Sequence, residues 1–135
     1  MPFQAGACIA TFVCMTLAQT LGRAAESLAA SYLERRGWTI LERNWRSGHK
    51  EIDLIAGRAG VIAFVEVKAR RARTHGHPLD AITGLKRRDL ARAARAWIAR
   101  RPSGGDADYR FDAIWVIGDP AGRHEIEHVP GAWRL

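Results

Sequence analysis

The chain has 135 residues, of which 47% are hydrophobic and 26% are charged, and it carries a formal net charge of +7 with a sequence pI of about 10.4. This length and balance are typical of one globular domain with its own core, and they exclude a mainly disordered chain. A strongly basic domain attracts polyanions, so nucleic acid is the first class of partner to consider.

The N-terminal stretch is apolar but does not fit a targeting segment. Its apolar run is shorter than the ~20 residues that a membrane-spanning helix needs, and no Lys or Arg precedes it as in a signal peptide. We therefore predict an N-terminal extension over residues 1–19 before a domain over 20–135, with Met15 as an alternative start, and a cytoplasmic protein that enters no membrane. Cys8 and Cys14 lie in this extension, and no nearby histidine completes a zinc site.

The spacing of apolar residues predicts a first helix over residues 20–36, and Gly37 suits a left-handed cap at its end. Glu26 lies on the flank of the apolar face of this helix. The residues that recur along that face at helical spacing are Leu21, Ala25, Leu28 and Tyr32.

The rest of the chain alternates between strands and one more helix. The strands predicted before that helix are 38–45, 51–56 and 61–69. The third strand is apolar on both faces, which places it centrally in a sheet. After a polar loop, the second helix covers about 81–101, and the last strands are 110–118 and a short 124–129. This order predicts one α/β domain, with a mixed β-sheet of about five strands flanked by helices.

Charged residues interrupt two of these apolar strands. Asp53 lies in the second strand, and Glu66 and Lys68 lie two residues apart in the third, on one face. Charged side chains are rarely buried unless they are paired or bind a metal. A short turn makes the two strands antiparallel neighbours, and a suitable register brings Asp53 close to Glu66.

Two adjacent carboxylates repel one another, and a divalent cation removes that cost. A few hard oxygen ligands that leave waters in place suit Mg²⁺ or Mn²⁺. The Lys68 ammonium beside such an ion could orient a water and balance developing negative charge. The alternative is a Glu66–Lys68 ion pair on an exposed sheet face, and the apolar surroundings favour the site.

The segments "EIDLIA" and "FVEVKAR" resemble the core of the PD-(D/E)xK nuclease superfamily. More narrowly, the chain resembles the YraN-like family of small bacterial endonuclease-like proteins, and the resemblance runs from about residue 21 to residue 133. The further segments that carry it include "GRAAE", "GWTILERNWR", "GHPLDAITGLKRRDLARAARAWI", "RFDAIWV" and "IEHVPGAW". It implies a restriction-endonuclease-like α/β core similar to that of Holliday-junction resolvases.

The resemblance also implies roles for single residues. Asp53 and Glu66 would be metal ligands, Lys68 the catalytic lysine, and Glu26 the acid that the first helix brings to the site in some members. Lys50 is a departure, because the family usually has glycine before Glu-Ile-Asp. Its positive charge beside the site could alter metal affinity.

Several basic residues are candidates for phosphate contacts. Lys86 interrupts the apolar face of the second helix, so it either extends to water or reaches the site. The arginines that follow the third strand next to the proposed site are Arg70, Arg71 and Arg73. The apolar residues around Lys86 on its helix are Ile82, Leu90, Ala93 and Trp97. The arginines on the opposite side, which we interpret as a solvated face, are Arg88, Arg92 and Arg95.

The leading hypothesis is a metal-dependent nuclease that hydrolyses phosphodiester bonds in DNA, branched DNA included. The alternative is a non-catalytic nucleic-acid-binding module on a nuclease-derived fold. No aromatic platform or base-reading helix distinguishes duplex, junction, flap, single strand or RNA. A homodimer is expected only by analogy with resolvases.

Overall fold

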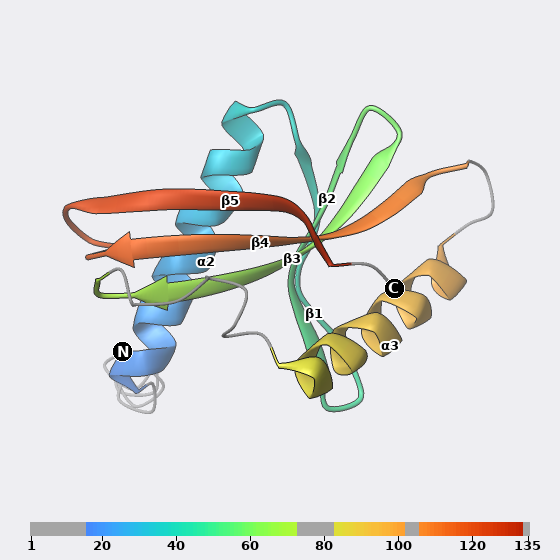
Figure 1. Cartoon of the computed structure of the whole chain (residues 1–135), viewed down its shortest axis with the longest axis horizontal. Helices are drawn as coiled ribbons and strands as arrows, with labels where there is room; N and C mark the ends of the chain where they lie inside the picture. The colour runs from blue at the N-terminus through green and yellow to red at the C-terminus, as the bar shows by residue number, and fades with distance from the viewer. Residues whose placement is uncertain (1–15, 73–82, 102–105, 134–135) are drawn as a thin grey trace, which may run out of the picture.

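The computed structural model describes residues 16–72, 83–101 and 106–133, and its elements follow the predicted order (Figure 1). The elements are α2 (Leu17–Arg35), β1 (Thr39–Ser47), β2 (Lys50–Arg58), β3 (Val61–Arg70), α3 (Gly84–Arg100), β4 (Asp108–Gly118) and β5 (His124–Trp133). The strands form one sheet in the order β1-β2-β3-β4-β5, with β3 central as predicted. The β3–β4 pair is parallel and the other three pairs are antiparallel, which confirms the predicted α/β fold with a mixed sheet.

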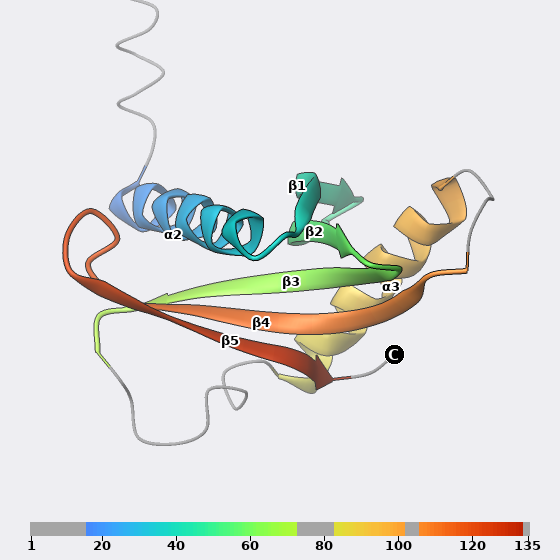
Figure 2. The ribbon, with the colours of Figure 1, turned by 90° about the horizontal axis from the view of Figure 1, so that it is seen from above.

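The two helices cover opposite faces of the sheet and build two separate cores (Figures 1 and 2). Each core is lined by apolar side chains from alternate positions of the central strands, because successive residues in a strand point to opposite faces. The side chains that α2 buries are Ala25, Ala29, Ala30 and Leu33. Those that α3 buries are Leu90, Ala93, Ala94 and Trp97, on the face predicted for this helix.

The buried stripe of α2 differs from the predicted one. Leu28 and Tyr32 are only half-buried, and the centre of the stripe is made of small residues that let the helix approach the sheet closely. Glu26 lies three residues before Ala29 and seven before Leu33, so it shares this stripe. The acid therefore faces the sheet instead of lying on the flank of the helix, as the sequence had suggested.

The first helix begins at Leu17, three residues earlier than predicted, because Thr16 caps it. The Gln19 backbone N–H donates to the Thr16 hydroxyl over 3.2 Å, and the Thr16 N–H donates to the Gln19 side chain over 3.0 Å. Met15 and both cysteines lie outside the described residues. In the described part of the chain, no helix is long and apolar enough to cross a membrane.

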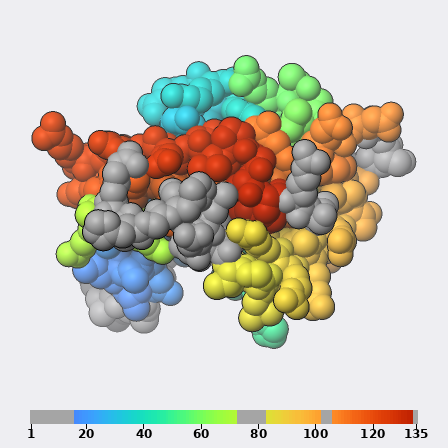
Figure 3. Space-filling view, in the orientation of Figure 1, coloured from blue at the N-terminus to red at the C-terminus, as the bar shows by residue number. Residues whose placement is uncertain are grey.

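The last strand is longer than predicted and ends at Trp133 rather than at residue 129. It passes through Pro130, which an edge strand tolerates because its outward N–H needs no partner. A register shift against β4 accompanies Gly131, whose φ is +57°. Figure 3 shows β5 spread across one face of the molecule, with α3 below it.

The sheet forks between β2 and β3. Their pairing ends at Leu54 and Val65, beyond which β2 stays with β1 while β3 continues beside β4. Figure 1 shows the two strands side by side near their turn and then parting. Asp53 is the first residue of β2 beyond the last β2–β3 pair. The fork therefore places a carboxylate where β3 is no longer paired with β2.

Candidate metal centre

Asp53 and Glu66 come together at this fork. The Val67 backbone N–H donates to Asp53 Oδ2 over 2.8 Å, so the carboxylate replaces the strand partner that β2 no longer supplies. Glu66, the first residue of β3 beyond its last pair with β2, is only 3% exposed. The antiparallel pairing therefore unites the two acids that the sequence placed on neighbouring strands.

The pair is electrostatically unfavourable without a partner. Burial, and next the Glu66 carboxylate, raise the pKa of Asp53 to about 8 against the opposing hydrogen bond from Val67. With both acids ionised, Glu66 Oε2 is buried and receives no hydrogen bond from the described residues. A shared proton from Asp53, or a bound cation, would satisfy this oxygen.

Two lysines approach the other oxygen of Glu66 from different elements. The Lys68 Nζ atom, on β3, lies 3.3 Å from Glu66 Oε1, and the Lys86 Nζ atom, in the first turn of α3, lies 3.6 Å from it. The Glu66–Lys68 ion pair is thus present, but its carboxylate is buried and does not lie on an exposed face. Lys86 reaches the same site while its side chain remains 41% exposed.

Glu26 lies on α2, the helix that covers the face of the sheet opposite to α3, and it approaches Asp53 and Glu66 from there. Burial raises its pKa, a hydrogen bond from the Asn44 side chain lowers it, and the charges of Glu51 and Glu66 raise it further. The Glu26 carboxylate also contributes to the raised pKa of Asp53. It therefore lies within electrostatic reach of the acid pair.

The donor set fits a hard divalent cation that keeps part of its water shell. Among the described residues, no three His, Cys, Asp or Glu side chains form a ready-made metal cluster. The protein offers instead two adjacent carboxylates, and one of their oxygens is buried and unpartnered when both are ionised. Mg²⁺ characteristically binds one or two carboxylates and several waters, so Asp53 and Glu66 suffice as its protein ligands.

A polar pocket that the sequence did not reveal opens beside Glu26. Its volume is about 600 Å³, and it lies between α2 and the β1–β2 hairpin. A smaller pocket of about 190 Å³ shares Arg23, Glu26 and Asn44 with it and also includes Arg43. The arginines of the two pockets come from α2 and β1, so no sequence spacing could have grouped them. The residues that line the larger pocket are Gln19, Gly22, Arg23, Glu26, Asn44, Arg46 and Glu51.

The arginines predicted to bind phosphate lie at the far end of β3. Arg70 and Arg71 are exposed and line a pocket of about 460 Å³ together with the β4–β5 turn. The guanidinium carbon of Arg70 lies 5.3 Å from the centre of the Trp115 ring, which partly fixes its direction. Arg73 lies outside the described residues. The arginines of α3 that we interpreted as a solvated face, Arg88, Arg92 and Arg95, are exposed.

Lys50, whose charge we expected to affect the metal site, has a partner away from the acids. Its Nζ atom lies 3.5 Å from Asp89 Oδ1 on α3. The added charge is therefore partly balanced by an ion pair that joins the start of β2 to the helix.

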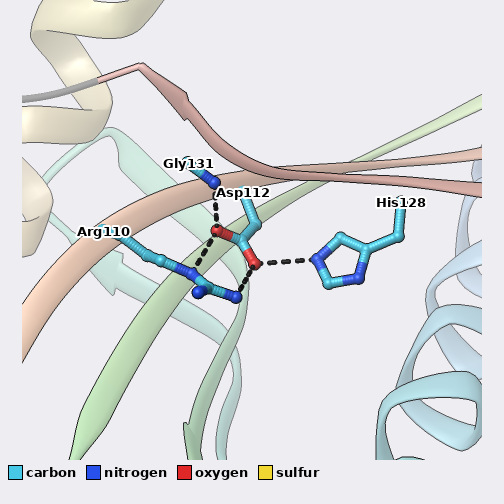
Figure 4. Close-up of polar contacts among 4 residues, drawn as sticks. All are labelled: Arg110, Asp112, His128 and Gly131. Atoms are coloured by element: carbon cyan, nitrogen blue, oxygen red, sulfur yellow. Dashed lines mark hydrogen bonds and ion pairs between the residues drawn. The ribbon is translucent and has the colours of Figure 1, made fainter.

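A second buried acid forms a separate cluster that the sequence analysis missed (Figure 4). Asp112 on β4 is fully buried and accepts two hydrogen bonds from Arg110, at 2.9 and 3.1 Å. His128 Nε2 on β5 lies 2.8 Å from it, and the Gly131 N–H donates over 3.0 Å. Burial alone would raise the pKa of Asp112, but the bonds from His128, Arg110 and Gly131 hold it below its usual value. This cluster joins β4 to β5.

The fold and the site together define a small α/β protein with an acid–acid–lysine set at a fork of its sheet, in which Glu66 is buried and Asp53 and Lys68 are partly buried. The chain belongs to the uncharacterised protein family UPF0102, the YraN family, whose model matches residues 25–116. That range contains every candidate residue of the acid site, Glu26 and Lys86 included.

Curated relatives span nearly the same length. A UPF0102 protein of Chlorobium chlorochromatii is 47% identical over 120 residues, which cover 84% of this chain and 90% of that protein. One of Chloroherpeton thalassium is 44% identical over 103 residues, or 76% and 79% of the two chains. One of Geobacter metallireducens is 42% identical over 117 residues, or 87% and 94%.

Proposed function

We propose that this protein is a metal-dependent phosphodiesterase that cleaves nucleic acid, with DNA, including branched DNA, as its substrate. The observation that carries the proposal is the Asp53–Glu66 pair. Among the described residues, Glu66 Oε2 is buried with no hydrogen-bond partner, and two lysines lie near Glu66 Oε1. The net charge of +7 supports a polyanionic substrate. The resemblance to PD-(D/E)xK nucleases agrees with this reading.

Asp53 and Glu66 would hold Mg²⁺ or Mn²⁺. When bound, the ion supplies a Lewis acid and lowers the pKa of a coordinated water. The Val67 N–H fixes one Asp53 oxygen, so the other is free for the cation. Lys68 would orient the attacking water and stabilise the charge that develops on the phosphoryl oxygens.

Lys86 would bind the substrate phosphate from the side of α3. In the structure both ammonium groups lie within ion-pair distance of Glu66 Oε1. Once the charge of Glu66 is neutralised by a cation, the two lysines can exchange this carboxylate for the phosphodiester. This exchange would couple substrate binding to metal binding.

The test is cleavage of a four-way junction, a flap, a linear duplex and a single strand, each with Mg²⁺, with Mn²⁺ and with EDTA. We expect metal-dependent cleavage of at least one substrate, and its loss in Asp53→Asn. Asp89→Asn, which changes a partly exposed acid paired with Lys50, is the matched control and should retain activity.

Tight DNA binding without cleavage under any of these conditions would contradict the proposal. It would instead support a non-catalytic binding module on the same fold. Light scattering of the protein with and without the four-way junction would show whether a homodimer forms, as a two-fold symmetric substrate would favour.

A further inference from the structure

The polar pocket between α2 and the β1–β2 hairpin has the size of a small-ligand site. Its volume of about 600 Å³ lies within the range of ~300–1,000 Å³ that such sites span. A pocket of this size can accept one nucleotide that has left the base stack. The paired bases of an intact duplex cannot enter it, because they stay stacked inside the double helix.

The wall of this pocket carries both signs of charge. The described part of it holds two arginines, two carboxylates and two side-chain amides. One of the arginines, Arg46, already forms an ion pair with Glu51 over 3.2 Å. A phosphate is bound best by an excess of positive charge, whereas the edge of a nucleobase carries hydrogen-bond donors and acceptors together. The mixed wall therefore suits a base better than a phosphate.

One strand residue that lines the pocket has an unusual backbone conformation. The φ of Asn44 is +50°, in the left-handed region, within β1 rather than in a turn. Asn44 lines both this pocket and the smaller one beside it. Backbone strain of this kind is retained mainly at ligand-binding and active sites. The asparagine amide also offers one acceptor and two donors, which match the edge of a base.

The pocket borders the proposed metal site. The β1–β2 register places Asn44 opposite Asp53. Glu51, which also lines the pocket, precedes Asp53 by two residues on β2, so the two side chains leave the strand on the same face. Leu54, the last residue of β2 that pairs with β3, lines the smaller pocket. A nucleotide in the pocket would thus adjoin the phosphodiester that reaches the acid pair.

We propose that this pocket receives the base of an unpaired nucleotide next to the scissile phosphodiester. The substrate class is then DNA with a single-stranded segment, a flap or a single strand, rather than an intact duplex. The inference rests on the proposed function, because it names the substrate class of the same site. Arg23, which lines the pocket and is exposed, would hold a phosphate beside the bound base.

Gly22 offers a way to narrow the pocket without disturbing the fold. It lines the pocket, and a Cβ atom added to it would meet no heavy atom of the described residues within 4 Å. Gly22→Leu therefore places a branched side chain in open space, and leucine favours a helix more than glycine does. Gly22→Ala is the matched control, because a single methyl group leaves most of the pocket free.

Fluorescence anisotropy in EDTA measures binding without metal-dependent cleavage. The labelled probes are a single strand, a duplex with a single-stranded flap and a blunt duplex. We expect wild type and Gly22→Ala to bind the first two about 10-fold more tightly than the blunt duplex, the scale of the contacts made by one base. Gly22→Leu should lose this preference and keep its affinity for the blunt duplex, which depends on backbone charge. Thermal melting checks that both variants remain folded.

Equal affinity of wild type for the three probes, or a Gly22→Leu variant that keeps the preference, would overturn the inference. Metal-dependent cleavage of the substrate panel would then still support the proposed function. Absence of cleavage across that panel would overturn the proposed function and the placement of the pocket beside a scissile bond. A preference that is lost in Gly22→Leu would even then assign the pocket to an unpaired base, because binding is measured in EDTA.

Discussion

At the scale of single residues, the acid pair stabilises the protein only while it carries a proton or a cation. The pKa of Asp53 is raised from 3.8 to about 8, so the folded protein holds this proton more tightly than the unfolded chain. Its contribution to stability is therefore complete below about pH 4 and is lost as the pH rises toward 8. For one proton the loss is at most about 1.4 kcal/mol per pH unit.

Asp53→Asn should remove this pH dependence in the metal-free protein. Asparagine can still accept the Val67 N–H, and its amide can donate to Glu66. In EDTA at pH 9 the variant should be more stable than wild type, whereas at pH 4 the two should be similar. Urea unfolding across this range measures the difference. A less stable variant at pH 9 would mean that the carboxylate is held by an attraction that the structure does not contain.

Lys68 and Lys86 both lie near Glu66 Oε1, but replacing each of them by alanine should impair a different step. Lys68→Ala should lower single-turnover cleavage about 10²–10³-fold while DNA and Mn²⁺ affinities persist, as expected for a group that acts mainly in the transition state. Lys86→Ala should mainly weaken DNA binding. A Lys68→Ala rate within about three-fold of wild type, far above the expected loss, would remove this lysine from the chemistry.

At the scale of elements, the Asp112 cluster adds side-chain hydrogen bonds to the backbone pairing between β4 and the edge strand β5. Its carboxylate receives donors from both strands, and His128 also packs edge-on against Tyr32 of α2, with 5.8 Å between ring centres. An edge strand exposes unpaired backbone on one side. A buried charge with four hydrogen bonds therefore fixes the register of a strand that would otherwise be weakly specified.

Asp112→Ala should destabilise the protein by about 3–5 kcal/mol, because it leaves Arg110 and His128 without their partner. Acid should act in the same direction. The pKa of Asp112 lies below 3.8, so its contribution is full above about pH 4 and is lost as the pH falls through the lowered value. Urea unfolding of wild type and Asp112→Asn from pH 7 to pH 3 measures this, with Asp89→Asn as the surface control. Parallel stability curves for wild type and Asp112→Asn would contradict the assignment.

The helices and strands were predictable where apolar residues recur at helical or strand spacing. The site was predictable only in part. Asp53, Glu66 and Lys68 interrupt apolar strands at a spacing of two, and this local pattern survives in the structure. The buried face of α2 was predicted wrongly because alanine is only weakly hydrophobic. The small size of these alanines nevertheless decides how closely the helix packs on the sheet. Asn44 and Asp112 were missed because their partners are distant in sequence, and only the register brings these residues together.

At the scale of the whole molecule, two surfaces that carry arginines lie on either side of the acid site. Arg70 is the last residue of β3, the strand that carries Glu66 and Lys68, and Arg71 follows it. Arg23 and Arg46 line the pocket beside Glu26, where Arg46 also pairs with Glu51 over 3.2 Å. A nucleic-acid strand that crosses the site can contact both surfaces.

These surfaces can be distinguished by the salt dependence of DNA binding. Each phosphate contact contributes about −0.9 to the slope of log K against log salt. Arg70→Ala, Arg71→Ala and Arg23→Ala should each reduce the slope by about one unit, whatever the DNA sequence, because backbone contacts carry no sequence information. The matched control is Arg92→Ala, on the exposed side of α3, which should leave the slope unchanged. If Arg92→Ala lowers the slope as much as the other variants, DNA binds over the whole basic surface. That result would contradict binding along a path across the acid site.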